Sequence, residues 1–221
     1  MLPPANPQRV PNLPRDSQHP PRGRHIAGVD EAGRGPWAGP VVAAAVILRT
    51  SSLSVRIDDS KRLSLAQRTR AFKVILDHAE VGVGIVCAEE IDRRNILQAT
   101  LLAMQEAILD LPQVPDLVLV DGTVAPPLDM PCQPIVHGDQ RSYVISCASI
   151  IAKVLRDRLM DFYHELDPRY AFNRHKGYGT ALHALRLNDW GPSLWHRRTF
   201  RPVMEQIGDG SIFHSERLAV R

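Results

Sequence analysis

Apolar residues along the chain form five short runs with the length of β-strands. Two runs, at 26–29 and 41–48, flank a glycine-rich turn and predict consecutive strands joined by a tight, exposed connection. The stretch "EVGVGIV" at 80–86 predicts a strand weakened by glycine. "LVLV" at 117–120 is apolar without alternation, which predicts burial on both faces, and "CQPIV" at 132–136 predicts a weaker strand.

Helical periodicity fills the segments between and after these runs. Ser64 is a suitable N-cap for a helix that ends near residue 79, and Asp92 can cap a long helix that stops before Pro112. A third helix is expected over about 143–165. The side chains that these patterns direct toward a core are Phe72, Ile75, Leu76, Ile96, Ala99, Leu102, Ala103, Ala107, Ile151, Leu155, Leu159 and Phe162.

This order of elements predicts the fold class. Strands at the start of the domain, followed by strands that alternate with helices, indicate an α/β domain with a mixed β-sheet flanked by helices. Ligands in such sheets bind beyond the carboxyl ends of the strands. A short helix and the stretches "HKGYGT" and "HRRTF" follow, as a small C-terminal helical extension.

The two ends of the chain lack this periodicity. Residues 1–24 hold seven prolines and few apolar positions, which is typical of a disordered proline-rich arm. We therefore expect one folded domain at 25–205, including the C-terminal extension, and a flexible tail at 206–221.

Composition narrows the class of protein further. The chain has 221 residues, is 44% hydrophobic and carries a net charge of +3, which permits a polyanionic partner without requiring one. The charge is uneven, because residues 153–201 hold ten Lys and Arg against five Asp and Glu. Three unpatterned cysteines suggest neither a disulfide framework nor a zinc site, and no apolar run is long enough to span a membrane. We expect a monomeric cytoplasmic protein.

Acidic residues follow three of the predicted strands. Asp30 and Glu31 follow the first run, Asp121 follows "LVLV", and Asp139 follows Gly138. Asp30 and Glu31 can share a site only if the strand ends or bulges there, because side chains alternate along a strand. Four carboxylates at one sheet edge repel one another unless cations intervene, and oxygen ligands favour Mg²⁺ or Mn²⁺. The alternative for each acid alone is a cap of a turn or helix.

Two other features each allow two interpretations. Gly33, Arg34 and Gly35 could form the start of a dinucleotide-binding fingerprint, but that motif must open a helix, and here a strand follows. The turn can instead bind a phosphate or a sugar hydroxyl through its backbone N–H groups and the guanidinium. "WHRRTF" at 195–200 suits core anchoring or nucleic-acid contact equally well.

The third predicted helix carries a polar face. Its members, at helical spacing, are Ser146, Ser149, Lys153 and Arg156. This face could contact successive phosphates, or it could be a solvated face with a Lys153–Asp157 ion pair. Tyr178 lies between glycines, where it could stack on a sugar or base or pack on the core.

Seven motifs together resemble ribonuclease HII, the type 2 ribonuclease H family. The resemblance covers about residues 26–201 and rests on "GVDEAGRGPWAGPVVAAAV", "DDSKRLS", "NILQAT", "LVLVDG", "GDQRSYVISCASIIAKVLRDRLM", "HKGYGT" and "HRRTF". It implies a ribonuclease H-like fold and a metal-dependent endonuclease. Such an enzyme cleaves the RNA strand of RNA–DNA hybrids and incises DNA on the 5′ side of embedded ribonucleotides, in DNA replication and repair.

The resemblance also implies roles for individual residues. The catalytic residues would be Asp30, Glu31, Asp121 and Asp139, which would hold two Mg²⁺ or Mn²⁺ ions. The cleavage reaction would leave 5′-phosphate and 3′-hydroxyl ends. Gly33, Arg34 and Gly35 would read the ribose 2′-hydroxyl, and Tyr178 would stack on the following deoxyribose. The implied phosphate contacts are Lys61, Ser149 and Lys153.

Two other functions are compatible with parts of this pattern. A non-catalytic nucleic-acid binding module on the same fold would be indicated by a missing acid, and all four acids are present. A type 3 ribonuclease H shares the fold and the acids, but normally carries a distinct N-terminal binding domain, where this sequence has a short proline-rich arm.

Overall fold

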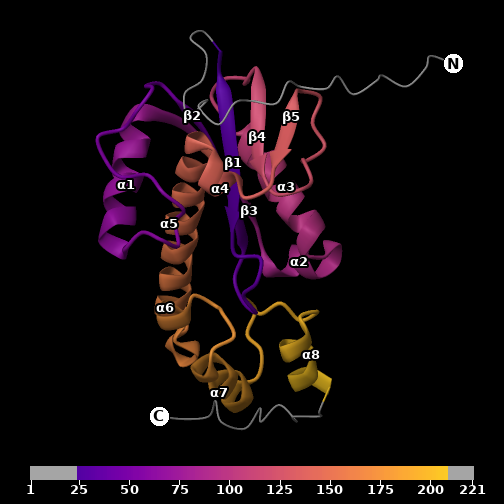
Figure 1. The fold of residues 1–221 in the computed structure, drawn as a ribbon. Helices are drawn as coiled ribbons and strands as arrows, with labels where there is room; N and C mark the ends of the chain where they lie inside the picture. The colour runs from indigo at the N-terminus through magenta and orange to yellow at the C-terminus, as the bar shows by residue number, and fades with distance from the viewer. Residues whose placement is uncertain (1–23, 209–221) are drawn as a thin grey trace, which may run out of the picture.

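A computed structural model describes residues 24–208, and these residues form a five-stranded sheet with helices on both faces (Figure 1). The strands are β1 (Ile26–Ala32), β2 (Val41–Leu48), β3 (Ala79–Val86), β4 (Leu117–Asp121) and β5 (Cys132–Ile135), in the order β3-β2-β1-β4-β5. β1 pairs with β2, and β2 with β3, in antiparallel fashion, whereas β1–β4 and β4–β5 are parallel. The predicted mixed sheet is confirmed.

Helices connect the later strands and complete the chain. Before β5 the helices are α1 (Leu65–His78), α2 (Ala88–Arg94) and α3 (Ile96–Leu109). After β5 come α4 (Gly138–Arg141), α5 (Tyr143–Leu166), a 3₁₀ turn η1 (Pro168–Tyr170), α6 (Phe172–His175), α7 (Ala181–Trp190) and α8 (Arg201–Gly208). The last three helices form the expected C-terminal extension, at the bottom of Figure 1.

The sheet separates two apolar cores. On one face, Ala44 and Val46 of β2 pack with side chains of α1 and α5. On the other face, Ala43 and Ala45 of the same strand pack with side chains of α3. This alternation follows from the two-residue period of a strand, and it makes the central strands apolar on both sides.

Glycine allows the long helix α5 to lie directly on β1. A Cβ at Gly28 would lie 2.4 Å from the backbone carbon of Val144 in α5, so a larger residue would push the helix away. The first turn of α5 therefore lies against the middle of β1.

The connection from β1 to β2 differs from its prediction. β1 continues through Ala32, and its pairing with β2 is regular at Asp30 and Glu31, with no bulge. The connection was expected to be exposed, but only Arg34 and Gly35 of residues 33–40 are. The segment is buried because it packs against the C-terminal extension, where Trp37 N donates to Gly177 O at 2.8 Å.

Two helix predictions were partly wrong. Ser64 caps α1 as expected, in a capping box with Gln67. Asp92 does not cap α3, because it lies inside α2, where its carboxylate accepts from Arg198 N and Thr199 N instead. Asn95 caps α3 by accepting from two backbone N–H groups. Leu76 and Phe162, expected to face a core, are 44% and 51% exposed, whereas Phe72 and Ile75 are buried as expected.

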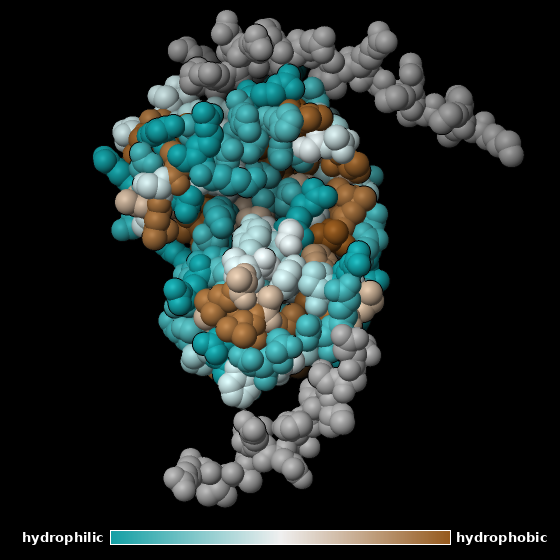
Figure 2. Space-filling view, turned by 60° about the horizontal axis from the view of Figure 1, so that its bottom comes forward, coloured by the Kyte–Doolittle hydropathy of each residue, from teal (hydrophilic) through white to brown (hydrophobic). Residues whose placement is uncertain are grey.

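Surface properties agree with a mainly hydrophilic exterior. Figure 2 shows hydrophilic residues over most of one face, with a compact hydrophobic patch on its lower part. In residues 24–208 no helix is long and apolar enough to cross a membrane. The predicted N-terminal arm and nearly all of the predicted C-terminal tail lie outside the described residues.

Candidate active site

All eleven candidate residues line one cavity. The cavity has a volume of about 790 Å³ and lies where β1 and β4 end. Three further residues line it: Ala32 and Ser60, which the sequence did not single out, and Ile96, which was expected to face a core. The candidates that line it are Asp30, Glu31, Gly33, Arg34, Gly35, Lys61, Asp121, Asp139, Ser149, Lys153 and Tyr178.

The strand period determines how the carboxylates meet. Asp30 and Asp121 share the parity of Ile26 and Leu119, which pack toward α5. Glu31 has the parity of Ala27 and Val29, which pack toward α3, and it nevertheless lines the same cavity. The two neighbouring acids of β1 thus share a site although the strand neither ends nor bulges between them, as the sequence argument had required.

Burial and mutual repulsion raise the pKa values of the two β1 acids. Asp30 is 5% exposed, and burial, followed by the charges of Glu31 and Asp121, raises its pKa well above the ordinary value. Burial also raises the pKa of Glu31, although Arg34 acts in the opposite direction. Ionising both acids in this environment therefore costs free energy.

The other two acids come from β4 and α4. Asp121 accepts a hydrogen bond from the backbone N–H of Gly138 at 2.6 Å, which ties the end of β4 to the start of α4. Asp139 follows in α4, and Ser146 Oγ of α5 donates to its backbone carbonyl at 2.7 Å. Burial, then the charges of Asp121 and Asp59, raise the pKa of Asp139.

This donor set suits a hard divalent cation. The four side chains offer only oxygen ligands, and a bound cation would remove the repulsion that raises the pKa of Asp30. Among the residues that the structure describes, no three acidic, histidine or cysteine side chains are already arranged closely enough to hold a metal ion.

The glycine-flanked turn lies at the rim of the cavity. Gly33 has φ +101°, which favours glycine, and a Cβ there would lie 2.0 Å from Arg156 Nε. Arg34 is exposed, and its guanidinium lies 3.5 Å from Glu31 Oε1. No helix follows the turn, so the dinucleotide-binding interpretation is wrong.

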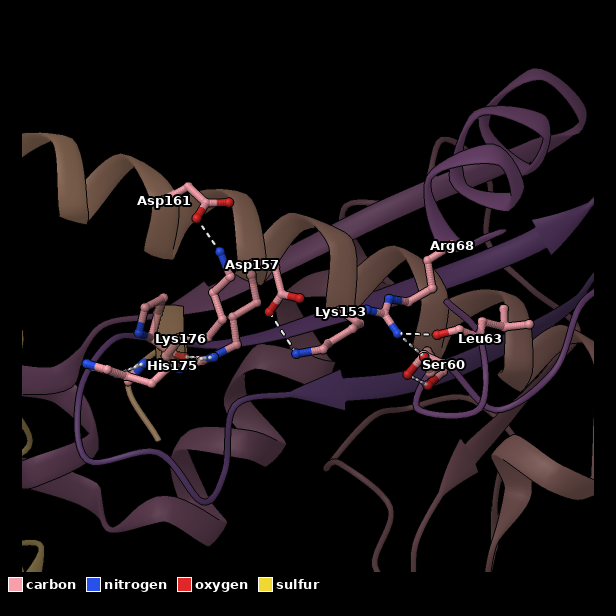
Figure 3. Close-up of polar contacts among 12 residues, drawn as sticks. Ser60, Leu63, Arg68, Lys153, Asp157, Asp161, His175 and Lys176 are labelled. Carbon is pink, nitrogen blue, oxygen red and sulfur yellow. Dashed lines mark hydrogen bonds and ion pairs between the residues drawn. The ribbon is translucent and has the colours of Figure 1, made fainter. Parts of the chain in front are cut away.

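Basic residues border the acids. Lys153 of α5 pairs with Asp157 at 2.7 Å, as Figure 3 shows, and Lys153 also lines the cavity. Lys61 lies in a loop that Arg68 holds through two carbonyl groups, those of Ser60 and Leu63. Ser149 Oγ donates to Ser60 Oγ at 3.0 Å.

Arg156 is a correction to the predicted polar face of α5. It was expected to share a phosphate-contacting or solvated face with Ser149 and Lys153, but it is fully buried. Its guanidinium donates to the carbonyl oxygens of Ala38, Pro40 and Lys176. Helical spacing shows which residues share a face but not what covers that face.

Tyr178 stands at the edge of the cavity and is 42% exposed. Lys153 Nζ and the Arg156 guanidinium carbon each lie 5.8 Å from the centre of its ring. An ideal Cβ on Gly35 would lie 4.0 Å from the ring. The ring thus has an accessible side, which is the arrangement that stacking needs.

The "WHRRTF" segment anchors the interior. His196 and Arg197 are 2% and 0% exposed. Arg197 donates to the carbonyl oxygens of Gly33, Arg34 and Gly39, so it belongs to the support of the site. The core-anchoring interpretation is confirmed for these two residues.

Comparison with known proteins agrees with the motifs. The family model described as ribonuclease HII matches residues 27–203. Ribonuclease HII of Chlamydia muridarum is 52% identical over 187 residues, covering 84% of this chain and 86% of that protein. Ribonuclease HII of Geobacter sulfurreducens is 53% identical over the same length and coverage.

Solved structures share the fold. The ribonuclease H2 of Pyrococcus horikoshii OT3 aligns with a TM-score of 0.69 at 25% identity, over 82% of this chain and 96% of that one. The Bst-RNase HIII in complex with Mn²⁺ aligns with a TM-score of 0.67 at 16% identity, over 85% and 70%. From the matched family model and the half-identical relatives, the chain belongs to the ribonuclease HII family.

Proposed function

We propose that the acid-lined cavity is where this ribonuclease HII hydrolyses the RNA strand of RNA–DNA hybrids and incises DNA on the 5′ side of embedded ribonucleotides. As a member of its family the protein is an endonuclease. The single observation that carries the proposal is that Asp30, Glu31, Asp121 and Asp139 line one cavity, with Asp30 buried. The reaction would leave 5′-phosphate and 3′-hydroxyl ends and would serve ribonucleotide removal in replication and repair.

The acids would hold Mg²⁺ or Mn²⁺. When bound, two such ions activate an attacking water and stabilise the leaving 3′-oxygen. A fold relative, the RNase HIII named above, was crystallised with Mn²⁺, which supports this choice. The charges of Glu31 and Asp121 both act on Asp30, which supports Asp30 as a residue that would help to hold both ions, whereas Asp121 and Glu31 would help to hold one and Asp139 the other.

The chain's other residues would bind and orient the nucleic acid. Gly33, Arg34 and Gly35 face the ribose 2′-hydroxyl in this proposal, and Tyr178 offers a ring face to the following deoxyribose. Lys61, Ser149 and Lys153 would contact phosphates, which suits their position around the acids.

Two alternatives remain distinct from this function. A type 3 enzyme is disfavoured because the half-identical curated relatives are ribonuclease HII proteins. A binding module without catalysis would bind the same duplexes and cut nothing, so activity has to be measured directly.

Product mapping on defined duplexes tests the proposal. One duplex carries a single ribonucleotide and a matched duplex is all DNA, each incubated with Mg²⁺, with Mn²⁺ or with a chelator. We expect a cut on the 5′ side of the ribonucleotide with either metal, no cut in the all-DNA duplex and none with the chelator. No cutting under any condition would leave only a binding module.

Cleavage should depend on Asp30. Asp30→Asn removes one charged oxygen ligand at nearly constant volume, and we expect it to abolish metal-dependent cleavage. Asp129→Asn is the matched control, because Asp129 is exposed and does not line the cavity. Near-normal turnover of the Asp30 variant would contradict the proposed site.

A further inference from the structure

Arg197 is a fully buried cation without an acidic partner. It is 0% exposed, and no ion pair joins it to a carboxylate in residues 24–208. Burial and the neighbouring Arg156 lower its pKa to about 9, so the guanidinium remains protonated at neutral pH. An unpaired buried charge is costly unless hydrogen bonds satisfy it, so the hydrogen bonds of Arg197 need an explanation.

Every hydrogen bond that Arg197 donates ends on the connection between β1 and β2. Nη2 donates to Gly33 O at 2.5 Å, and Nη1 donates to Arg34 O at 2.9 Å. Nε and Nη2 donate to Gly39 O at 3.0 and 2.9 Å. The planar, buried guanidinium therefore donates hydrogen bonds to three carbonyl groups of one short segment.

The hydrogen bonds from Arg197 determine which way the neighbouring backbone N–H groups point. In a trans peptide the C=O and the N–H of the same plane point in opposite directions. Because the carbonyls of Gly33 and Arg34 point inward to Arg197, the N–H groups of Arg34 and Gly35 point away from it. Within the described residues neither N–H has a recorded acceptor, and both residues line the cavity.

We infer that Arg197 is a positioning residue for ribonucleotide specificity, which fixes the Arg34 and Gly35 N–H groups as donors toward the 2′-oxygen of a ribose. The inference rests on the proposed function of the cavity. The donors are held before substrate arrives, so little conformational entropy is lost on binding. A deoxyribose offers no acceptor at this position, and the two donors would then lose their partner.

The guanidinium cannot be replaced by another cation. Lysine keeps the charge, but its single ammonium group has no rigid fork that matches two neighbouring carbonyls. The exposed Arg34 side chain, which pairs loosely with Glu31, is not held in this way. Arg197→Lys therefore loosens the backbone donors while it preserves the net charge that attracts phosphates.

Binding without turnover tests the inference. Affinity is measured by fluorescence anisotropy in a chelator, for a duplex with one ribonucleotide and for the same duplex with deoxyribose at that position. The readout is the ratio of the two dissociation constants. We expect Arg197→Lys to reduce this ratio by roughly fivefold to tenfold, the factor for one hydrogen bond, while affinity for the all-DNA duplex stays near that of the wild type.

Arg68→Lys is the matched control. Arg68 also holds two carbonyls of a loop at the cavity, those of Ser60 and Leu63, but it does not contact the Gly33–Gly35 turn. We expect this variant to keep the wild-type ratio. Equal loss of the ratio in both variants would overturn the inference, because it would indicate general loosening of the cavity.

A second measurement needs no substitution at Arg197, which covers the case in which its variant does not fold. In ¹⁵N–¹H spectra of the wild type, the Arg34 and Gly35 amide protons should shift further with the ribonucleotide duplex than with the all-DNA duplex. Equal shifts would overturn the inference. Metal-dependent cleavage by the same wild-type sample tests the catalytic function separately, so cutting with equal amide shifts would contradict the Arg197 inference and the proposed role of the turn but not the cleavage activity.

Discussion

Asp30 occupies a position that folding alone would fill with an apolar side chain. It follows Val29 on the central strand, is 5% exposed and feels the charges of Glu31 and Asp121. The raised pKa of this carboxyl means that its ionised form destabilises the folded state in the absence of a cation. Such a cost at a single residue is typical of a functional site.

Replacing this carboxylate should therefore stabilise the metal-free protein. Asp30→Asn removes the charge and keeps an acceptor for the Glu31 N–H, which Asp30 Oδ1 binds at 2.7 Å. We expect a gain of about 1–3 kcal/mol in the free energy of unfolding, seen as a rise in Tm in the presence of a chelator. Because the folded pKa is raised, the gain should be larger near pH 8 than near pH 5, where the wild-type carboxyl is more protonated.

The exposed control separates charge removal at the site from charge removal in general. Asp129→Asn should change the free energy of unfolding by no more than about 0.5 kcal/mol at either pH, and the Tm should shift correspondingly little. A Tm of the Asp30 variant equal to or below that of the wild type would show that the carboxylate is not a source of destabilisation.

At this scale the sequence predicted the acids well and the arginines poorly. Asp30 and Asp121 were recognisable because each ends an apolar run, and strand ends meet at one sheet edge. Arg156 and Arg197 could not be recognised as buried, because their partners are backbone carbonyls, which carry no sequence signal. Their burial depends on a connection and an extension that pack against each other across the molecule.

Close helix–sheet approach is the element-scale feature that brings the site together. The sequence predicted α5 and β1, but the missing Cβ of Gly28 is what lets their backbones touch. Glycines on β3 do the same for α3, where a Cβ at Gly84 would lie 2.0 Å from Ala103 O. The α3 boundary was missed because Asn95, at φ 72°, both ends α2 and caps α3.

Replacing Gly28 or Gly84 by alanine should distinguish effects on stability from effects on the geometry of the site. Gly28→Ala and Gly84→Ala should each lower the free energy of unfolding by about 2–4 kcal/mol, because helix backbone must move. Only Gly28→Ala displaces α5, which carries Ser149 and Lys153, relative to Asp30. Urea denaturation measures the stability, and KM and kcat are measured at a temperature where both variants are folded.

We expect Gly28→Ala to lower kcat several-fold more than Gly84→Ala does at matched folded fraction. The glycine on β3 serves as the control because its contact lies on the opposite face of the sheet. Equal kinetic effects of the two substitutions would mean that the spacing of α5 and β1 does not determine the geometry of the acids.

Across the whole molecule, lowering the pH should have opposite effects on stability through two groups of residues: it should stabilise the protein at Asp30 and destabilise it at the histidines of the C-terminal extension. Three buried histidines support the C-terminal extension: His175, His183 and His196. Ser193 N donates to His196 Nδ1, and the Nε2 atoms of His183 and His196 lie 3.0 Å apart, an arrangement that neutral rings satisfy by sharing one proton. Burial lowers the pKa of His183 to about 4 and that of His196 to about 3.

These histidines should make the protein acid-sensitive below neutral pH. A folded pKa below the unfolded value of about 6.5 means that the unfolded chain binds more protons as the pH falls. Between about pH 7 and pH 5, His183 and His196 should each lower the free energy of unfolding by roughly 2 kcal/mol. Urea denaturation across this range measures the loss. Because the raised pKa values of Asp30, Glu31 and Asp139 act in the opposite direction, the series is run in the Asp30→Asn background, where the net loss should exceed that of the wild type. Stability at pH 5 equal to or above that at pH 7 in this background would contradict the expected effect of the histidines.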